Sequence, residues 1–312
     1  MNILILGAAS FVGKNLTIEL AKDLDNNITL VDVSKDYFSH IDSIHSENIH
    51  VKESAFMSDT NFDELLENQD VVYHLVSTNV PATSNQYISQ EINSNLVFSD
   101  NLLKSCVKCG VQKVVFTSSG GAVYGKETEC PIKEDTITNP ISSYGVQKIT
   151  IEKLLYLYRY IYGLDYRIIR LANPYGPYQR PNGTLGVVTN FVYKALKGEK
   201  ITVYGDGSVV RDFIYINDAV RAIMKISDGE NKHHIFNVGC GYGTSIKQLL
   251  CIISQALNLE LDVTYKEGRK ADVPVNYLDI SRYEKYYGKL NPVSLSEGVK
   301  LTAEFLKQYY NI

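Results

Sequence analysis

The sequence predicts an α/β protein, with a doubly wound parallel sheet in the first part of the chain and a smaller α/β domain after it. In the first part, short runs rich in β-branched residues alternate with amphipathic stretches of helical periodicity. Such alternation is typical of a parallel sheet with helices on both faces, whose ligands lie beyond the carboxyl ends of the strands. After Asn173 the alternation ends in a loop rich in proline and glycine, which separates the two parts.

The first part, residues 1–172, is expected to form the sheet and the helices that cover it. Each expected strand is short and apolar, and each expected helix is amphipathic, with apolar residues recurring three or four positions apart. The expected strands are Ile3–Leu6, Ile28–Val31, Val71–Leu75, Val114–Thr117 and Tyr166–Arg170, and the expected helices are Lys14–Leu24, Asp63–Glu67, Asn95–Cys109 and Tyr144–Tyr162.

The second part, residues 173–312, has shorter elements, and we expect it to form the smaller domain, with later strands returning to the first sheet. The expected helices here are Val188–Lys197, Asp218–Ile226, Ile246–Leu257 and Leu295–Tyr309, and the expected strands are Ile201–Tyr204 and Ile235–Val238.

The composition excludes several classes of protein. A net charge of −4, from 31 basic and 35 acidic residues, gives no footprint for the backbone of nucleic acid. No apolar run approaches the ~20 residues that span a bilayer. The chain begins on a strand-like run rather than on a basic targeting segment. We therefore expect a cytoplasmic protein that binds neither nucleic acid nor membrane.

The cysteines predict neither disulfides nor a metal site. Five cysteines in a large chain are an odd number, which argues against a disulfide framework. Cys106 and Cys109 have C-x-x-C spacing, but no second Cys/His pair follows at the spacing of a zinc site. Their segment has the pattern of a helix that ends at Gly110.

A glycine turn follows the first expected strand and opens the first expected helix. Dinucleotide-binding folds need a tight turn there, a backbone close to the pyrophosphate and a helix N-terminus that attracts anions. Ser10 stands in place of the middle glycine, and its N–H and hydroxyl can still donate hydrogen bonds. The residues predicted to bind the cofactor phosphates are Gly7, Ser10, Phe11, Val12 and Gly13.

Asp32 ends the second expected strand, 19 residues after Gly13. A carboxylate at this place accepts hydrogen bonds from the adenosine ribose and repels a 2′-phosphate, which favours NAD over NADP. Two alternatives stay open: Asp32 is a surface residue in a turn, or the nearby Lys35 accommodates NADP.

Tyr144 and Lys148 lie four residues apart, on one face of an expected helix. With 23 tyrosines in the chain the spacing alone means little, and Tyr193 and Lys197 repeat it. The context distinguishes the two pairs. The first follows a strand that ends in Ser118–Ser119, which brings hydroxyl groups to the carboxyl edge of the sheet. The second pair has no such partner, so Tyr193 is expected to be a packing residue.

Six motifs occur in one order along nearly the whole chain, and together they resemble the extended short-chain dehydrogenase/reductase family. The resemblance is to its nucleotide-sugar epimerases of the UDP-glucose/UDP-galactose 4-epimerase type, and it implies a Rossmann-like fold, NAD, a nucleotide-sugar substrate and a homodimer. The motifs are the turn Gly7–Gly13, Thr117–Ser119 before Val123–Gly125, Tyr144 with Lys148, Arg170–Pro177, Val203–Gly207 before Arg211–Phe213, and Arg269 with Asp272.

By this resemblance, Tyr144 takes a proton from a sugar hydroxyl while hydride passes to NAD⁺, and a 4-keto intermediate turns over before the hydride returns. Lowering the pKa of a tyrosine by about three units requires ~4 kcal/mol of stabilisation of the phenolate relative to the phenol. The positive charges of Lys148 and of a cationic nicotinamide are suitable sources of this stabilisation. The family's catalytic serine or threonine falls at Gly120 here. We assign the hydroxyl to Ser119, with Ser118 as the second candidate; both serines could instead cap the strand end.

The resemblance also implies the residues around the substrate. A solvated surface role is the alternative for each arginine, although the planar guanidinium suits paired bonds to phosphate oxygens. Asn173, Arg211 and Arg269 match positions that hold the diphosphate. Tyr204 matches a position that lines the nucleobase pocket, and Asn95 matches one near the nicotinamide ribose. Leu75 is counted with the cofactor residues, and Asp272 with the substrate residues.

Three readings of the activity compete with 4-epimerisation. The first is a sugar dehydratase, which by resemblance carries an Asp-Glu pair just before Val-Tyr-Gly to eliminate water. This chain has Gly121 and Ala122 there, so dehydration is disfavoured. A related reductase or decarboxylating enzyme is the second choice. A non-catalytic dinucleotide sensor would have a decayed Tyr-x-x-x-Lys motif.

The sugar and the assembly are less directly encoded. By resemblance, some hexose-specific relatives carry a tyrosine at the position of Asn276. Because asparagine is smaller, we expect room here for an N-acetyl group at C2 of the sugar. The apolar faces of the helices Asn95–Cys109 and Tyr144–Tyr162 resemble a pair that forms a dimeric four-helix bundle. The alternative is that these faces only cover their own sheet.

Overall fold

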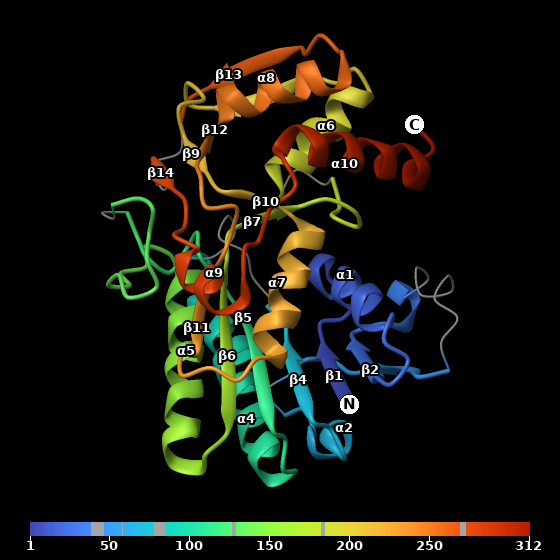
Figure 1. Ribbon diagram of the computed structural model, residues 1–312, viewed down its shortest axis with the longest axis vertical. Helices are drawn as coiled ribbons and strands as arrows, with labels where there is room; N and C mark the ends of the chain where they lie inside the picture. The colour runs from blue at the N-terminus through green and yellow to red at the C-terminus, as the bar shows by residue number, and fades with distance from the viewer. Residues whose placement is uncertain (39–46, 58, 78–84, 127–128, 182–184, 269–272) are drawn as a thin grey trace.

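The computed structural model describes residues 1–38, 47–57, 59–77, 85–126, 129–181, 185–268 and 273–312. Within them lies a seven-stranded sheet in the order β11-β6-β5-β4-β1-β2-β3, with every neighbouring pair parallel (Figure 1). The predicted α/β class with a doubly wound sheet is confirmed. The strands are β1 (Asn2–Leu6), β2 (Asn27–Asp32), β3 (Ile49–Glu53), β4 (Val71–His74), β5 (Lys113–Ser119), β6 (Asp165–Leu171) and β11 (Ile235–Val238).

Helices cover both faces of the sheet, as the continuous apolar strands require. Ile3 and Ile5 belong to one hydrophobic cluster, with α1 (Phe11–Leu20) and α7 (Ile216–Asp228). Leu4 and Leu6 alternate with them and belong to the other, with α4 (Phe98–Lys108) and α5 (Ser143–Tyr162). All four side chains are fully buried, because successive residues of a central strand face opposite layers.

The second part of the chain forms its own hydrophobic cluster and also contributes to the first sheet. Strand β11 pairs with β6, and α7 packs on the sheet beside α1. The remaining helices and strands are α6 (Val187–Leu196), α8 (Ile246–Leu257), α9 (Ser281–Tyr287), α10 (Leu295–Tyr310), β7 (Asn173–Tyr175), β8 (Ile201–Tyr204), β9 (Val210–Arg211), β10 (Phe213–Tyr215), β12 (Thr244–Ser245), β13 (Val263–Lys266) and β14 (Val275–Asn276).

The short strands of the second part form small ladders that surround the carboxyl edge of the large sheet. β7 pairs with β10, and β8 pairs with β13. β9 lies between β12 and β14, so that residues distant in the sequence meet there.

The helices differ from expectation at three places, one of which is α9, a helix that the sequence analysis did not predict. The first helix begins at Phe11, three residues earlier than predicted, because Ser10 caps it there, and it ends at Leu20, four residues earlier than predicted. The helix predicted as Asn95–Cys109 is preceded by α3 (Ile88–Ile92) and begins as a π-helical segment, η2 (Asn93–Val97), before α4 continues it. The short helix predicted at Asp63 is α2 (Asp63–Leu66).

Candidate active site

The glycine turn joins β1 to α1 in a conformation that depends on its glycines. Gly7 has a φ of +80°, in the left-handed region. A Cβ atom on Gly13 would lie 2.5 Å from the carbonyl oxygen of Gly7, so the helix packs on the turn more closely than any side chain allows. Ser10 caps α1 by accepting a hydrogen bond from the Gly13 N–H at 3.1 Å. The N–H groups of Phe11 and Val12 lie in the first turn, where helices bind anions.

Asp32 closes the turn from the end of β2. Its carboxylate accepts hydrogen bonds from the N–H groups of Ala9 and Val33, both at 2.8 Å. Leu75 follows β4 and donates its N–H to Leu6 at 3.0 Å, between the two strands where the sheet order reverses. A free helix N-terminus, a glycine packed without room for a Cβ atom and a carboxylate beside the turn fit a dinucleotide at this edge.

Helix α5 brings Tyr144 and Lys148 over the end of β5. The Ser119 hydroxyl lies close enough to the Tyr144 phenol to lower its pKa. The Lys148 ammonium donates to the Thr117 carbonyl at 2.9 Å and lies 5.6 Å from the centre of the Tyr144 ring. The predicted tyrosine, lysine and serine are therefore neighbours at the carboxyl edge of the sheet.

Burial shifts both titrating groups away from their charged forms. It raises the pKa of Tyr144 to about 12, and the neighbouring Ser119 hydroxyl opposes the rise. It lowers the pKa of Lys148 to about 8, and the carboxylate of Glu152 opposes this shift. In the protein by itself, burial therefore outweighs the effect of the Ser119 hydroxyl on the phenol. The lowered tyrosine pKa that the sequence led us to expect requires a further positive charge beside the ring.

Ser118 has a different partner from Ser119. It is buried, and its hydroxyl donates to Glu152 at 2.6 Å. Glu152 also forms a buried ion pair with Arg170 at 2.6 Å, and Arg170 donates to the Tyr124 hydroxyl at 3.0 Å. The geometry thus favours Ser119 over Ser118 as the hydroxyl beside the phenol. The sequence analysis missed Glu152, although it lies one helical turn after Lys148 on the same face.

A second polar network supports the start of α5, and the sequence analysis missed most of it. The buried carboxylate of Glu91 accepts hydrogen bonds from Ser143 at 2.6 Å and from Gln147 at 3.0 Å. Asn95, in the π-helical segment, donates to Gln147 at 2.8 Å. Asn95 therefore contacts the catalytic helix through the residue that precedes Lys148.

Gly120 occupies the place of the hydroxyl residue in the resembling family, and the structure gives a reason for the glycine. A Cβ atom there would lie 2.5 Å from the side chain of Leu278. The Gly120 carbonyl accepts a hydrogen bond from the Asn276 amide at 3.3 Å. Asn276 is buried, and its Oδ1 atom has no hydrogen-bond partner among the described residues.

The other predicted substrate residues that the structure describes lie on strands of the second part of the chain. Arg211 faces Asn276 across the β9–β14 ladder and donates to the Val273 carbonyl at 2.6 Å. Asn173 donates to the carbonyl of Asp212 at 2.9 Å. Tyr204 ends β8 with 42% of its surface exposed. Arg269 and Asp272 lie outside the described residues.

Three further observations concern metal binding, the cysteines and membrane-spanning helices. Among the described residues, no group of three or more His, Cys, Asp or Glu side chains is arranged to hold a metal ion. Burial raises the pKa of the Cys106 thiol, and Cys109 follows it at the end of α4. Of the helices that the structure describes, none combines the length and the apolar character needed to cross a membrane.

Residues 3–239 match the model of the NAD dependent epimerase/dehydratase family. A UDP-glucose 4-epimerase of Mycolicibacterium smegmatis is 32% identical, with 98% of this chain and 99% of the relative covered. Relatives of similar extent are named a dTDP-4-dehydro-6-deoxyglucose reductase in Escherichia coli, at 31%, and a UDP-N-acetyl-alpha-D-glucosaminuronate decarboxylase in Bacillus cytotoxicus, at 30%.

Solved structures show the same similarity over the whole chain. A UDP-glucose 4-epimerase of Thermotoga maritima with UDP-glucose superposes with a TM-score of 0.89 at 33% identity, covering 99% of this chain and 100% of its own. A UDP-N-acetylglucosamine 4-epimerase of Methanobrevibacter ruminantium, in complex with UDP-N-acetylmuramic acid, has a TM-score of 0.90 at 29% identity, covering 99% and 98%.

The ion pair beneath the site gives a stability prediction. Replacing Glu152 with alanine leaves the buried Arg170 guanidinium without its carboxylate, so we expect the free energy of unfolding to fall by ~3–5 kcal/mol in urea denaturation. The control is Arg159→Ala, which removes an ion pair with Asp165 whose side chains are 43% and 28% exposed. Its expected cost is at most ~1 kcal/mol. Equal losses in the two variants would contradict the prediction.

Proposed function

Since this chain belongs to the NAD-dependent epimerase/dehydratase family, we propose that it interconverts UDP-sugars that differ in configuration at C4. The observation that carries the proposal is the contact of Ser119 with Tyr144, with Lys148 beside the ring, at the carboxyl edge of the sheet. Gly121 and Ala122 have no carboxyl group for the elimination of water. Relatives named a reductase and a decarboxylase make those activities the alternative.

Tyr144 is the proposed acid and base of the reaction. Its phenol takes the proton of the C4 hydroxyl when the sugar is oxidised and returns it when the ketone is reduced on the other face. Bound NAD supplies the reversible oxidation of that carbon. Ser119 donates a hydrogen bond to the same oxygen, which stabilises the charged phenol. Lys148 adds a positive charge 5.6 Å from the ring centre.

The residues proposed to hold NAD surround the glycine turn. The N–H groups at the start of α1 face the pyrophosphate, and Asp32 accepts bonds from the adenosine ribose. The full proposed set is Gly7, Ser10, Phe11, Val12, Gly13, Asp32, Leu75 and Asn95, together with Tyr144 and Lys148.

The residues proposed for the UDP-sugar lie in the second part of the chain, across the sheet edge from Tyr144. Arg211 and Arg269 suit the diphosphate because a guanidinium bonds two phosphate oxygens at once. Asn173, Tyr204 and Asp272 complete the proposed set.

Asn276 is the proposed determinant of the C2 substituent. Its Oδ1 atom is buried beside Gly120 without a partner among the described residues, so it is available to an N-acetyl N–H group. We therefore propose that the enzyme accepts UDP-N-acetylhexosamines as well as UDP-hexoses. A similar solved structure is named a UDP-N-acetylglucosamine 4-epimerase, which supports this choice.

Removal of the phenol hydroxyl tests the proposed chemistry. We expect Tyr144→Phe to lower the turnover of UDP-galactose to UDP-glucose by ~10²- to 10⁴-fold, the usual contribution of a general acid–base group. Tyr193→Phe is the matched control, because Tyr193 and Lys197 have the same spacing, and its turnover should be unchanged. Chromatography of the nucleotide sugars measures both. Full turnover by Tyr144→Phe, a 4-keto-6-deoxy product from dTDP-glucose, or strict dependence on added NADPH would contradict the proposal.

A larger side chain at Asn276 tests the proposed sugar specificity. Tyrosine at this position should fill the space for the N-acetyl group, so kcat/KM for UDP-N-acetylglucosamine should fall at least about tenfold relative to that for UDP-glucose, a difference of ~1.4 kcal/mol. Asn276→Ser keeps the space open and serves as the control. An Asn276→Tyr enzyme with the same ratio of kcat/KM values as the wild type would refute this role.

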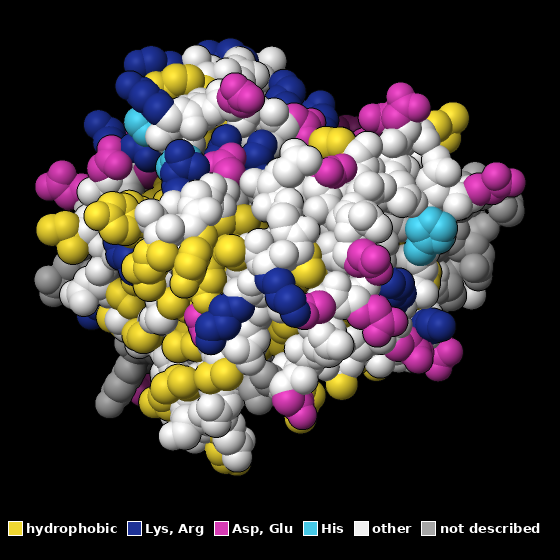
Figure 2. Space-filling view, turned by 90° about the horizontal axis from the view of Figure 1, so that it is seen from below, with side chains coloured by type: hydrophobic (Ala, Val, Ile, Leu, Met, Phe, Trp, Pro, Cys, Tyr) yellow, Lys and Arg dark blue, Asp and Glu magenta, His cyan; other side chains and the backbone are white. Residues whose placement is uncertain are grey.

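We also propose that two copies of the chain associate through the outer face of α5. Tyr156, Leu157, Tyr160 and Ile161 are 60%, 45%, 80% and 54% exposed on this one helix. Figure 2 views the molecule from below and shows apolar side chains gathered on the side where α5 lies. Exposed apolar patches of this kind are typical of protein interfaces.

A charge on this face should separate the dimer. We expect Leu157→Glu to sediment as a monomer at micromolar concentration, because burying an unpaired carboxylate at an apolar interface is strongly unfavourable. Tyr265→Glu, at a 53% exposed position on β13, is the control and should keep the assembly of the wild type. A monomeric wild type, or a Leu157→Glu dimer, would rule out this interface.

A further inference from the structure

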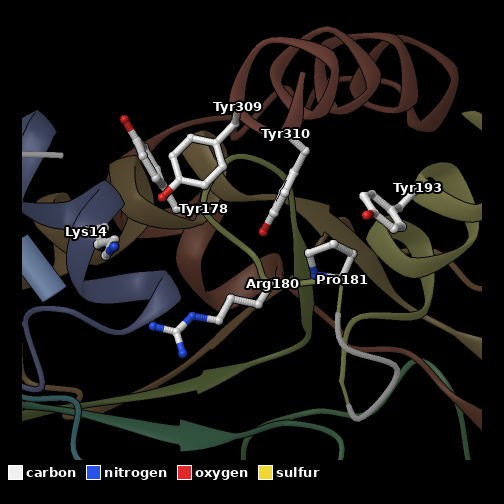
Figure 3. A pocket seen from close by; sticks show the side chains of 7 residues that line it. All are labelled: Lys14, Tyr178, Arg180, Pro181, Tyr193, Tyr309 and Tyr310. Carbon is white, nitrogen blue, oxygen red and sulfur yellow. The ribbon is translucent and has the colours of Figure 1, made fainter. Parts of the chain in front are cut away.

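A pocket of about 320 Å³ lies between α1, α6 and the end of α10, and the proposed reaction uses none of its lining residues. Figure 3 shows four tyrosine rings around it, with the side chains of Lys14 and Arg180 on one side. Its volume is at the lower end of the range for small-molecule sites. The lining residues are Lys14, Tyr178, Arg180, Pro181, Tyr193, Tyr309 and Tyr310.

The two cations of the pocket have no anionic partner in its wall. Lys14 is 92% buried, since its relative exposure is 8%. Within the described part of the chain, neither its ammonium nor the Arg180 guanidinium forms an ion pair or a side-chain hydrogen bond. Each lies over a ring instead: Lys14 is 5.8 Å from the centre of Tyr178, and Arg180 is 5.6 Å from that of Tyr37.

The surroundings of Lys14 are unfavourable to a positive charge. It lies in the first turn of α1, where the helix dipole is positive. Burial and the neighbouring Arg180 lower its pKa, and only Asp32 acts in the opposite direction. Both oxygens of Asp32 already accept backbone hydrogen bonds. A buried cation in this setting is stabilised by an anion that enters the pocket.

The tyrosines provide flat surfaces that hold one another in place. The ring centres of Tyr309 and Tyr310 lie 5.1 Å apart. Those of Tyr310 and Tyr193 lie 5.5 Å apart, and those of Tyr178 and Tyr309 lie 6.0 Å apart. Such a cluster is pre-organised to stack a planar ring.

We propose that this pocket is a second ligand site, which takes a small molecule that joins a phosphate or a carboxylate to a flat ring. The anionic group lies between Lys14 and Arg180, and the ring lies against the tyrosines. None of the lining residues belongs to the proposed NAD and UDP-sugar sets, although Lys14 directly follows Gly13.

Isothermal titration calorimetry of the NAD-loaded enzyme tests the proposal. The titrations are repeated with Arg211→Gln, which weakens the proposed diphosphate site and should leave binding in this pocket unchanged. The probes are 4-nitrophenyl phosphate, 4-nitrobenzoate and the neutral 4-nitrobenzyl alcohol. One of the two anions should bind at least tenfold more tightly than the alcohol, and the tighter of the two identifies the anionic group. Inorganic phosphate should bind more weakly than 4-nitrophenyl phosphate, because it lacks the ring.

Variants locate the binding. Lys14→Gln and Arg180→Gln should each weaken the anion by about tenfold or more, the cost of one hydrogen bond to a charged group. Tyr310→Ala should reduce the preference for 4-nitrophenyl phosphate over inorganic phosphate. Lys22→Gln, two residues beyond the end of α1 and paired with Glu19, is the matched control and should bind like the wild type.

Three outcomes would overturn the proposal: no binding of either anion at millimolar concentration, equal binding of the anions and the alcohol, or affinities that Lys14→Gln and Arg180→Gln both leave unchanged. The NAD content of each purified variant is measured in parallel. Loss of NAD from Lys14→Gln would place Lys14 in the cofactor site and would also overturn it. Because Arg180 and Tyr310 are exposed, their variants keep the test valid even where Lys14→Gln fails to fold.

Discussion

The buried ion pair between Glu152 and Arg170 holds strand β6 against helix α5, and the positions of Tyr144 and Lys148 depend on it. Neither charge is stable alone in the interior, so the strand and the helix keep one relative position. Glu152 lies one turn after Lys148 and two turns after Tyr144, so that position also sets the height of both side chains above the sheet edge.

The second constraint is a single carboxylate that ties the second part of the chain to this edge. Asp212 is fully buried and accepts hydrogen bonds from the N–H groups of Cys240 and Leu278, at 2.7 and 3.2 Å. Burial raises its pKa, while these N–H groups stabilise the charge. Since Leu278 packs against Gly120, next to Ser119, one interaction aligns the proposed substrate residues with the proposed catalytic serine.

The periodicity of apolar residues predicts the long elements well, because the spacing of these residues within a helix or strand defines its buried face. It fails for elements whose stability comes from distant partners. β3 is half polar at the edge of the sheet, and the two-residue strands β12 and β14 form by pairing with β9, which lies between them. In the π-helical turn at Asn93–Val97, Asn95 donates a hydrogen bond to Gln147 on α5, a contact that local spacing does not reveal.

The sequence by itself determined the fold class, the glycine turn and the acidic residue at the end of β2, since each rests on residue types at short spacing. It also favoured Tyr144 over Tyr193, which stays a prediction. Only the tertiary structure separated Ser118 from Ser119, because neighbouring residues of a strand point to opposite sides and each hydroxyl finds a different partner. The same holds for the pocket that joins Lys14 to Arg180: its charges come from distant segments, and only the packing of α1 against the second part of the chain brings them together.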